Sequence, residues 1–208
     1  MGASIDGKHA GTFGHISCFS THPLKNLNAL VDGGFLITNS KKYYDFIKLY
    51  RNHGLRGRDD VRLFGVNSRL DSLNAEVLSM RLKKLKKLII KRNLNAKFYK
   101  KNISTNKIKF PKSISNTSNA YVMFLAICEK RNKLQLYLKS KGIQTFIYYG
   151  KPLHLHQASK LIGYRKNSLP IAEEVCKKVL AFPIHQYLKK VELKYICNCI
   201  NNFYRNES

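Results

Sequence analysis

The sequence predicts an α/β protein built in two parts. Apolar residues make up 44% of the 208 residues, which is enough for a packed core. Short apolar runs alternate with helical patterns, and a polar, Ser/Asn-rich stretch at 107–119 precedes a second series of strands and helices. We therefore expect a domain boundary between residues 106 and 107, with a first part over 1–106 and a small α+β domain over 107–208.

The first part contains two predicted strands and two predicted helices. They are strands at 14–19 ("GHISCF") and 33–39 ("GGFLITN"), a helix at 41–54 that Gly54 ends, and a long helix from 71 to about 102. We expect the first strand to be buried. The segment "RLKKLKKLIIKR" of the long helix is basic and amphipathic. It is either a polyanion-binding or membrane-surface helix, or, as we favour, a helix with a solvated lysine face.

The second part is predicted to alternate strands with helices. Its elements are strands at 120–128 and 143–149, and helices at 130–142, at about 170–180 and at 189–204. Gly142 ends the first of these helices. This order is typical of a small α+β domain.

The charge is the most prominent feature of the composition. There are 38 Lys and Arg residues against 12 Asp and Glu residues, for a formal net charge of +26. Such an excess attracts polyanions, so a nucleic-acid or polyanion-binding protein is one alternative function. The basic residues are spread along the chain, however, and no recognised nucleic-acid motif with interleaved aromatic residues accompanies them.

The location of the protein and the state of its cysteines follow from two further patterns. No apolar run approaches the length of a membrane span, and no secretory signal is present at the start, so we expect a soluble, cytoplasmic protein. The five cysteines do not have the spacing of a zinc or redox site. We expect them to be reduced and mostly buried.

The stretch "FSTHPLKNL" (19–27) places Ser20 and His22 shortly before Lys25. A lysine amine is a nucleophile towards an aldehyde when it is positioned and activated. Pyridoxal phosphate carries such an aldehyde and a phosphate, which Ser20 could bind through its hydroxyl while Pro23 restricts the loop. Serine and lysine at this spacing are common, so the pattern alone does not define a site.

Longer blocks around this stretch resemble the DegT/StrS family of nucleotide-sugar aminotransferases. The blocks are "GTFGHISCFSTHPLKNLNALVDGGFLITN", "LYRNHGLRGRD", "FGVNSRLDSLNAEVL", "GIQTFIYYGKPLHLHQA" and "LPIAEEVCKKVLAFPIH". They occur in the family's order and at fitting distances, over about residues 2–204. The resemblance implies a fold-type-I enzyme that depends on pyridoxal 5'-phosphate, with residues 1–106 as the C-terminal part of its large αβα domain. Such an enzyme transfers an amino group, usually from glutamate, to a keto-sugar nucleotide for surface polysaccharide or lipopolysaccharide sugars.

The resemblance also implies roles for particular residues. Lys25 matches the lysine that binds the cofactor aldehyde and shuttles the proton, and Ser20 matches a phosphate-binding serine. Asn67 matches an asparagine that reaches the cofactor phosphate of the neighbouring subunit, so a homodimer is implied. Arg69 shares that motif, and it is either a binding residue or part of a structural salt bridge.

Three histidines lie in matching blocks: His22, His53 and His154. Each is either part of the sugar site or a structural or surface histidine. Val31, where the family often has glycine, and Gly150, where proline is common, depart from the family pattern. We expect these departures to alter substrate fit without affecting the lysine chemistry.

The family carries an N-terminal half before the region matched here. By resemblance, that half holds an aromatic residue that stacks on the cofactor ring and an aspartate that keeps the ring nitrogen protonated. Met1 lies just after the matching place, and Asp6 lies too late in the block to replace the aspartate. We therefore expect the C-terminal part of an aminotransferase, truncated or working with a separately encoded N-terminal half. A catalytically inactive relative is the further alternative.

Overall fold

The computed structural model describes residues 1–207, which fall into two compact units. The first comprises residues 1–90 and 114–122, and the second comprises residues 91–113 and 123–207. The boundary expected between residues 106 and 107 stays a prediction, because compactness within this chain does not define the domains of a longer fold. No helix in the described part is long and apolar enough to cross a bilayer.

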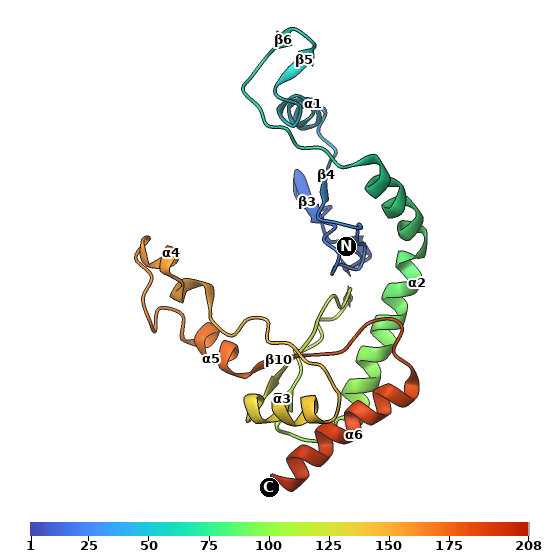
Figure 1. The fold of residues 1–208 in the computed structure, drawn as a ribbon, viewed down its shortest axis with the longest axis vertical. Helices are drawn as coiled ribbons and strands as arrows, with labels where there is room; N and C mark the ends of the chain where they lie inside the picture. Colours follow the sequence, from blue (N-terminus) through green and yellow to red (C-terminus); the bar gives the residue numbers. More distant parts are fainter. Residues whose placement is uncertain (208) are drawn as a thin grey trace. The chain divides into compact units, whose positions relative to one another are not determined.

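The first unit is built from short antiparallel sheets and two helices. Its elements are β1 (Ser4–Ile5), β2 (Lys8–His9), β3 (Ile16–Ser20), β4 (Gly34–Thr38), α1 (Lys41–Tyr50), β5 (Leu55–Gly57), β6 (Asp60–Val61), β8 (Thr117–Ser118) and the first part of α2 (Ser72–Asn102). β3 pairs with β4, β5 with β6, and β1 lies between β2 and β8. Figure 1 shows β3 and β4 side by side. Both predicted strands and both predicted helices of this part are confirmed.

The prediction that the first strand is buried is wrong for this chain. No residue of β3 or β4 is fully buried, although Phe19 and Phe35 stack across the pair with ring centroids 5.2 Å apart. The two strands form a sheet of their own, so neither face of β3 is covered along its length. A two-stranded sheet is marginally stable by itself in water.

The basic segment of α2 is helical, and its lysines are exposed. Lys83, Lys84, Lys86 and Lys87 all lie on the solvent side, whereas Leu85 is buried. The apolar side is incomplete, because Leu82 and Ile90 are more than half exposed. This agrees with the interpretation of a solvated lysine face, with some apolar residues left uncovered.

The second unit is a three-stranded antiparallel sheet covered by helices. Its elements are β7 (Ile108–Lys109), β9 (Phe124–Cys128), α3 (Arg131–Ser140), η1 (Leu153–Leu155), α4 (Gln157–Lys160), α5 (Pro170–Lys178), β10 (Val179–Phe182) and α6 (Lys190–Asn206), together with the end of α2. The strand order is β10–β9–β7, and α3 contacts both β10 and α6 (Figure 1). The strand at 120–128 and the three predicted helices are confirmed.

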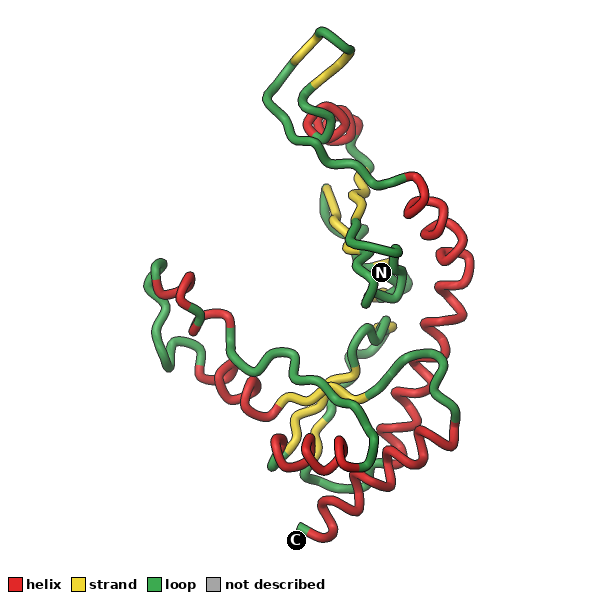
Figure 2. The backbone as a smooth tube through the Cα atoms, viewed as in Figure 1, coloured by secondary structure: helices red, strands yellow, loops and turns green. Residues whose placement is uncertain are grey.

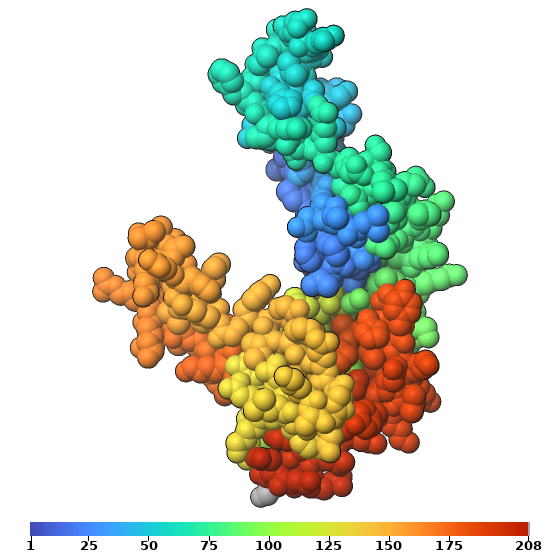
Figure 3. All heavy atoms as spheres, in the orientation of Figure 1, coloured from blue at the N-terminus to red at the C-terminus, as the bar shows by residue number. Residues whose placement is uncertain are grey.

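The predicted strand at 143–149 is wrong. This segment is irregular, and Phe146 alone forms a bridge, to Ala181. The chain then continues into residues 151–168, which project from the rest of the second unit (Figures 2 and 3). The strand that pairs with β9 is instead β10, which directly follows α5.

The core of the second unit is apolar and aromatic. Tyr99, Phe124 and Leu138 are almost inaccessible to solvent, and the rings of Tyr99 and Phe124 stack 5.2 Å apart. The cysteines are free thiols; Cys128, Cys197 and Cys199 are buried, whereas Cys176 is half-buried and Cys18 is exposed. Burial raises the pKa of the Cys128 and Cys197 thiols to about 12, so both are protonated at neutral pH. The expectation that most of the cysteines are buried is confirmed.

The helix α3 offers a matched test of this core. Leu138 is fully buried, whereas Leu136 on the same helix is 68% exposed. We expect Leu138→Ala to lower the free energy of unfolding by about 2–5 kcal/mol, because the deletion removes buried area and leaves a cavity. Leu136→Ala should change it by no more than about 0.5 kcal/mol. Chemical denaturation of the two variants measures the difference, and equal effects would contradict this core assignment.

Candidate active site

Lys25 lies on a loop that connects β3 to β4. The loop is closed by two backbone hydrogen bonds, from Thr21 N–H to the Gly33 carbonyl (2.8 Å) and from Ala29 N–H to the Thr21 carbonyl (2.7 Å). The Lys25 N–H donates to the His22 carbonyl (2.8 Å), which forms a tight turn. Within residues 1–207 the exposed Lys25 side chain has no hydrogen bond or ion pair. Its amine is therefore not engaged by another side chain of the described residues.

The amino group of Met1 lies close enough to Lys25 for the two charges to interact. Burial lowers the pKa of the Met1 amine, and the Lys25 charge lowers it further. Lys25 therefore lies near the segment that precedes β1, within the same unit.

Ser20 and His22 flank the start of the same loop. The Ser20 Oγ accepts the His22 N–H (3.2 Å), so its own hydroxyl hydrogen remains available as a donor. The His22 Nδ1 accepts the Leu24 N–H (3.1 Å), which places the ring hydrogen of the neutral form on Nε2. That Nε2 lies 3.6 Å from Asp32 Oδ1, so His22 bridges the two sides of the loop.

Polar and apolar residues of α2 hold this loop in place. The Asn74 Oδ1 accepts the Leu30 N–H (3.0 Å), and the Arg81 guanidinium donates to the Asn28 carbonyl (2.6 Å). Leu27 and Ala29 on the loop pack in one buried cluster with α2 residues Leu78 and Leu85. Residues 27–30 of the loop are thus fixed to a long helix.

The sequence did not single out Asn74 and Arg81. The signal was present, because they are seven residues apart and share one face of a helix with Leu78 and Leu85. Polar residues inside an apolar stripe indicate a packed polar partner, which here is the backbone of the lysine loop.

Asn67, Arg69 and His53 belong to a second loop region of the first unit. Asn67 is exposed and pairs through its backbone with Asn52. The Arg69 guanidinium donates to the Asn52 side-chain oxygen, which ties the two segments together. Arg69 is therefore engaged within the protein, an arrangement that supports the structural alternative for this residue, although by a hydrogen bond rather than a salt bridge.

The backbone around His53 requires unusual conformations. His53 itself has φ +59°, and its N–H donates to the Val66 carbonyl (3.0 Å). Gly54 has φ +72°, and a Cβ there would lie 1.6 Å from the Leu63 carbonyl oxygen. Only glycine fits this crossing, which positions His53 next to the segment that carries Asn67.

His154 lies in the second unit and is 5% exposed. Its Nε2 is 2.9 Å from Glu173 Oε1, and the same oxygen accepts the Asn167 N–H (2.6 Å). Glu173 thus ties both ends of the projecting segment 151–168 to α5. This buried arrangement supports the structural alternative for His154.

The Glu173 carboxylate gives a prediction about pH. The hydrogen bond from His154 lowers the pKa of Glu173 below its usual value of 4.5. Stability from the charged form is therefore present above about pH 4.5 and is lost as the pH falls through the lowered pKa. We expect Glu173→Gln to lower the melting temperature at neutral pH, with the difference from the wild type shrinking below about pH 4.5.

Melting curves between pH 3 and pH 7 measure this effect. Glu76→Gln is the control, because Glu76 is exposed on α2 and has no hydrogen bond or ion pair within residues 1–207. A Glu173→Gln difference that stays constant over the whole range would show that the charge of Glu173 does not stabilise the fold.

The seven candidate site residues therefore fall into two groups in the first unit and one single residue, His154, in the second. Ser20, His22 and Lys25 share the loop on α2, and His53, Asn67 and Arg69 share the other region. No hydrogen bond or ion pair between described residues joins these two groups. The roles predicted for all seven residues stay predictions.

Comparison with known proteins gives the family. The model of the DegT/DnrJ/EryC1/StrS aminotransferase family matches residues 1–201. The chain belongs to this family. The chain spans only about half the length of the curated relatives it matches.

Among those relatives is the erythromycin biosynthesis sensory transduction protein EryC1 of Saccharopolyspora erythraea, which is 34% identical over 91% of this chain and 52% of its own length. A second is the UDP-2-acetamido-2-deoxy-3-oxo-D-glucuronate aminotransferase of Pseudomonas aeruginosa, which is 30% identical over 97% of this chain and 55% of its own length.

Solved structures of the family have the same fold as this chain. A DegT DnrJ EryC1 StrS aminotransferase from Brucella abortus superposes with a TM-score of 0.91 at 31% identity, covering 97% of this chain and 54% of that one. DesV of S. venezuelae, solved in complex with a ketimine intermediate, gives a TM-score of 0.92 at 29% identity over 97% of this chain and 55% of that one. The α/β, fold-type-I prediction is confirmed.

Proposed function

We propose that this chain is the lysine-bearing part of a pyridoxal-phosphate-dependent aminotransferase that acts on keto-sugar nucleotides. The observation that carries the proposal is the unpaired, exposed Lys25 amine on a loop clamped to α2, in a chain of the DegT/DnrJ/EryC1/StrS family. Relatives named as sugar aminotransferases support the substrate class, with UDP- and dTDP-linked sugars in their names. The product would supply amino sugars for surface polysaccharide or lipopolysaccharide, in the cytoplasm.

The residues of the loop fit pyridoxal phosphate. A free primary amine suits the aldehyde of that group, and the Ser20 hydroxyl hydrogen is available to a phosphate oxygen. The cofactor, when bound, supplies an aldehyde and a ring that withdraws electrons from the substrate carbon. Lys25 would hold the aldehyde covalently between turnovers, and its amine would carry the proton from and to the substrate carbon.

Other residues would bind and orient the reactants. Asn67 is exposed on its loop, and we propose that it reaches the phosphate site of a partner subunit in a homodimer. We propose that His22, whose Nε2 lies 3.6 Å from Asp32 Oδ1 on the same loop, contacts the sugar near Lys25. His53 and Arg69 are the remaining candidates for substrate contact. Glutamate is the proposed amino donor.

The proposal includes the other half of the large domain, whether it precedes this chain in one polypeptide or is separately encoded. The exposed faces of β3 and β4 support this, because the lysine loop connects two strands that have no further neighbours in their sheet. A functional site needs a fixed loop, and a larger sheet would fix both of its ends.

The test is amino transfer by the assembled enzyme. Residues 1–208, combined with the first half of the fold, should convert keto-sugar nucleotides to amino sugars with glutamate as donor. A panel of UDP-, dTDP- and GDP-linked keto sugars, followed by mass spectrometry of the product, identifies the substrate. Amine formation on none of them by a folded, assembled protein would contradict the proposed function.

A further inference from the structure

A cavity of about 600 Å³ lies in the second unit, beside the first turn of α6. This volume is in the range of small-molecule sites, roughly 300–1,000 Å³. Its most buried lining is apolar and consists of Ile143, Phe182 and Ile196, each no more than 5% exposed. None of the seven candidate site residues lines it.

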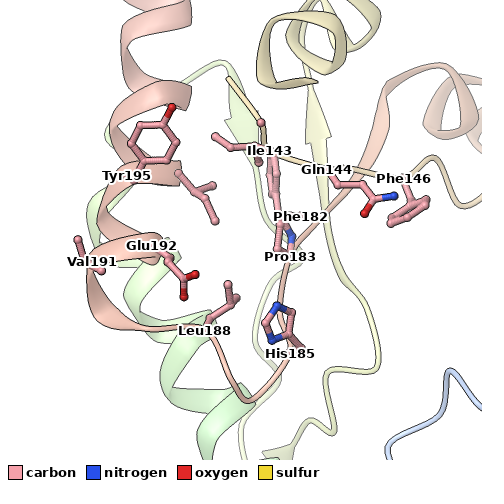
Figure 4. A pocket seen from close by; sticks show the side chains of 12 residues that line it. Ile143, Gln144, Phe146, Phe182, Pro183, His185, Leu188, Val191, Glu192 and Tyr195 are labelled. Atoms are coloured by element: carbon pink, nitrogen blue, oxygen red, sulfur yellow. The ribbon is translucent and has the colours of Figure 1, made fainter. Parts of the chain in front are cut away.

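Aromatic rings and one carboxylate stand around this apolar lining. Phe146, His185 and Tyr195 contribute rings, and Figure 4 shows the Glu192 side chain directed into the space between them. Glu192 is the one acidic residue in the lining. Aromatic faces combined with a carboxylate favour an organic cation over an anion.

The remaining acidic residues of the second unit are all engaged with basic side chains. Within the described residues, Glu129 pairs with Lys107, Glu173 with His154, Glu174 with Lys178 and Glu207 with Lys130. Glu192 has no ion pair there, although this unit is rich in lysine. Among the described residues of this unit, Glu192 is therefore the carboxylate that no basic side chain neutralises.

Glu192 also has a local role, which engages only one of its two carboxylate oxygens. Its Oε2 accepts the Lys189 N–H (2.6 Å) at the start of α6. The reciprocal bond of a capping box needs an acceptor on residue 189, and a lysine ammonium has none. Oε1 thus has no partner among residues 1–207 and is free for a ligand.

We propose that this cavity binds a hydrophobic organic cation. The hydrocarbon or aromatic part would lie against Ile143, Phe182 and Ile196, and the ammonium or guanidinium group would lie beside Glu192 and the ring of Tyr195. A neutral analogue loses the charge interaction, and an anionic analogue is repelled by Glu192. The site does not depend on the proposed aminotransferase activity.

The test uses phenylbutylammonium as the probe, titrated by calorimetry or NMR into the assembled protein, residues 1–208 combined with the first half of the fold. Phenylbutanol and phenylbutyrate are the neutral and anionic analogues of the same shape. We expect saturable binding of the cation. Its affinity should exceed that of the alcohol by up to about fivefold, a small factor because Glu192 is solvent-exposed. The carboxylate should bind more weakly than either. No saturable binding of the cation, or equal affinity for all three, would overturn the proposal.

Two variants and one control assign the binding to this cavity. Glu192→Gln keeps an oxygen for the Lys189 N–H and removes the charge, so the cation should bind no more tightly than the alcohol. Glu174→Gln, which removes a carboxylate outside the cavity, should leave the preference unchanged. Val191→Trp fills the rim of the cavity at a residue that is 70% exposed and should abolish binding without affecting the fold. A preference that survives Glu192→Gln, or binding that survives Val191→Trp, contradicts the assignment.

Discussion

Replacing Lys25 with alanine will abolish amino transfer by the assembled enzyme, lowering the rate by at least about 10²–10⁴-fold. The amine has two proposed tasks, to hold the cofactor aldehyde and to carry a proton at the substrate carbon, and alanine can do neither. The substitution leaves the loop intact, because the hydrogen bond that residue 25 makes to His22 comes from its backbone N–H. Amine formation on the keto-sugar nucleotide measures the loss.

Lys48→Ala is the matched control for this prediction. Lys48 is also an exposed lysine of the first unit, on α1, and we expect its removal to leave the rate unchanged. A Lys25→Ala enzyme that retains wild-type turnover would show that another group carries the proton and binds the cofactor.

Residues 1–208 alone should show no multiple turnover. The loop that holds Lys25 connects β3 and β4, which form a two-stranded sheet with no fully buried residue. Apolar side chains such as Ile16, Leu36 and Ile37 are more than a third exposed there. Such a sheet is marginal without further strands, so the position of the lysine is not fixed well enough for catalysis.

Supplying the first half of the fold should restore activity and reduce aggregation. It would add strands and helices that cover the exposed apolar faces of the first unit, which otherwise favour association between chains. Amine formation and size-exclusion chromatography, with and without that half, measure both effects. Robust multiple turnover by a monodisperse sample of residues 1–208 would contradict this prediction.

The sequence was sufficient to predict most of the elements that position the site. Gly54 marks the end of α1, and the recurring apolar residues mark α2. The apolar runs at 14–19 and 33–39 mark the two strands on either side of Lys25. The family blocks predicted roles for Ser20, Lys25 and Asn67, which periodicity alone does not provide, and these roles stay predictions.

The errors lie where tertiary pairing decides the outcome. Residues 143–149 have the composition of a strand, but Phe146 alone finds a partner, and the continuous ladder with β9 is made by β10. Val179–Phe182 follow a helix with no glycine or proline between, so no local signal separates that strand from α5. The contacts of His154 and Arg69 also depend on residues distant in sequence, Glu173 and Asn52, which no spacing rule connects to them.

The central claim is that Lys25 binds the cofactor, and chemical trapping tests it most directly. The assembled protein is incubated with pyridoxal phosphate, reduced with borohydride and digested, and the modified peptide is sequenced by mass spectrometry. We expect the reduced adduct on Lys25, and its loss in Lys25→Ala but not in Lys48→Ala. An adduct on a different lysine, in a protein that still transfers the amino group, would contradict the account.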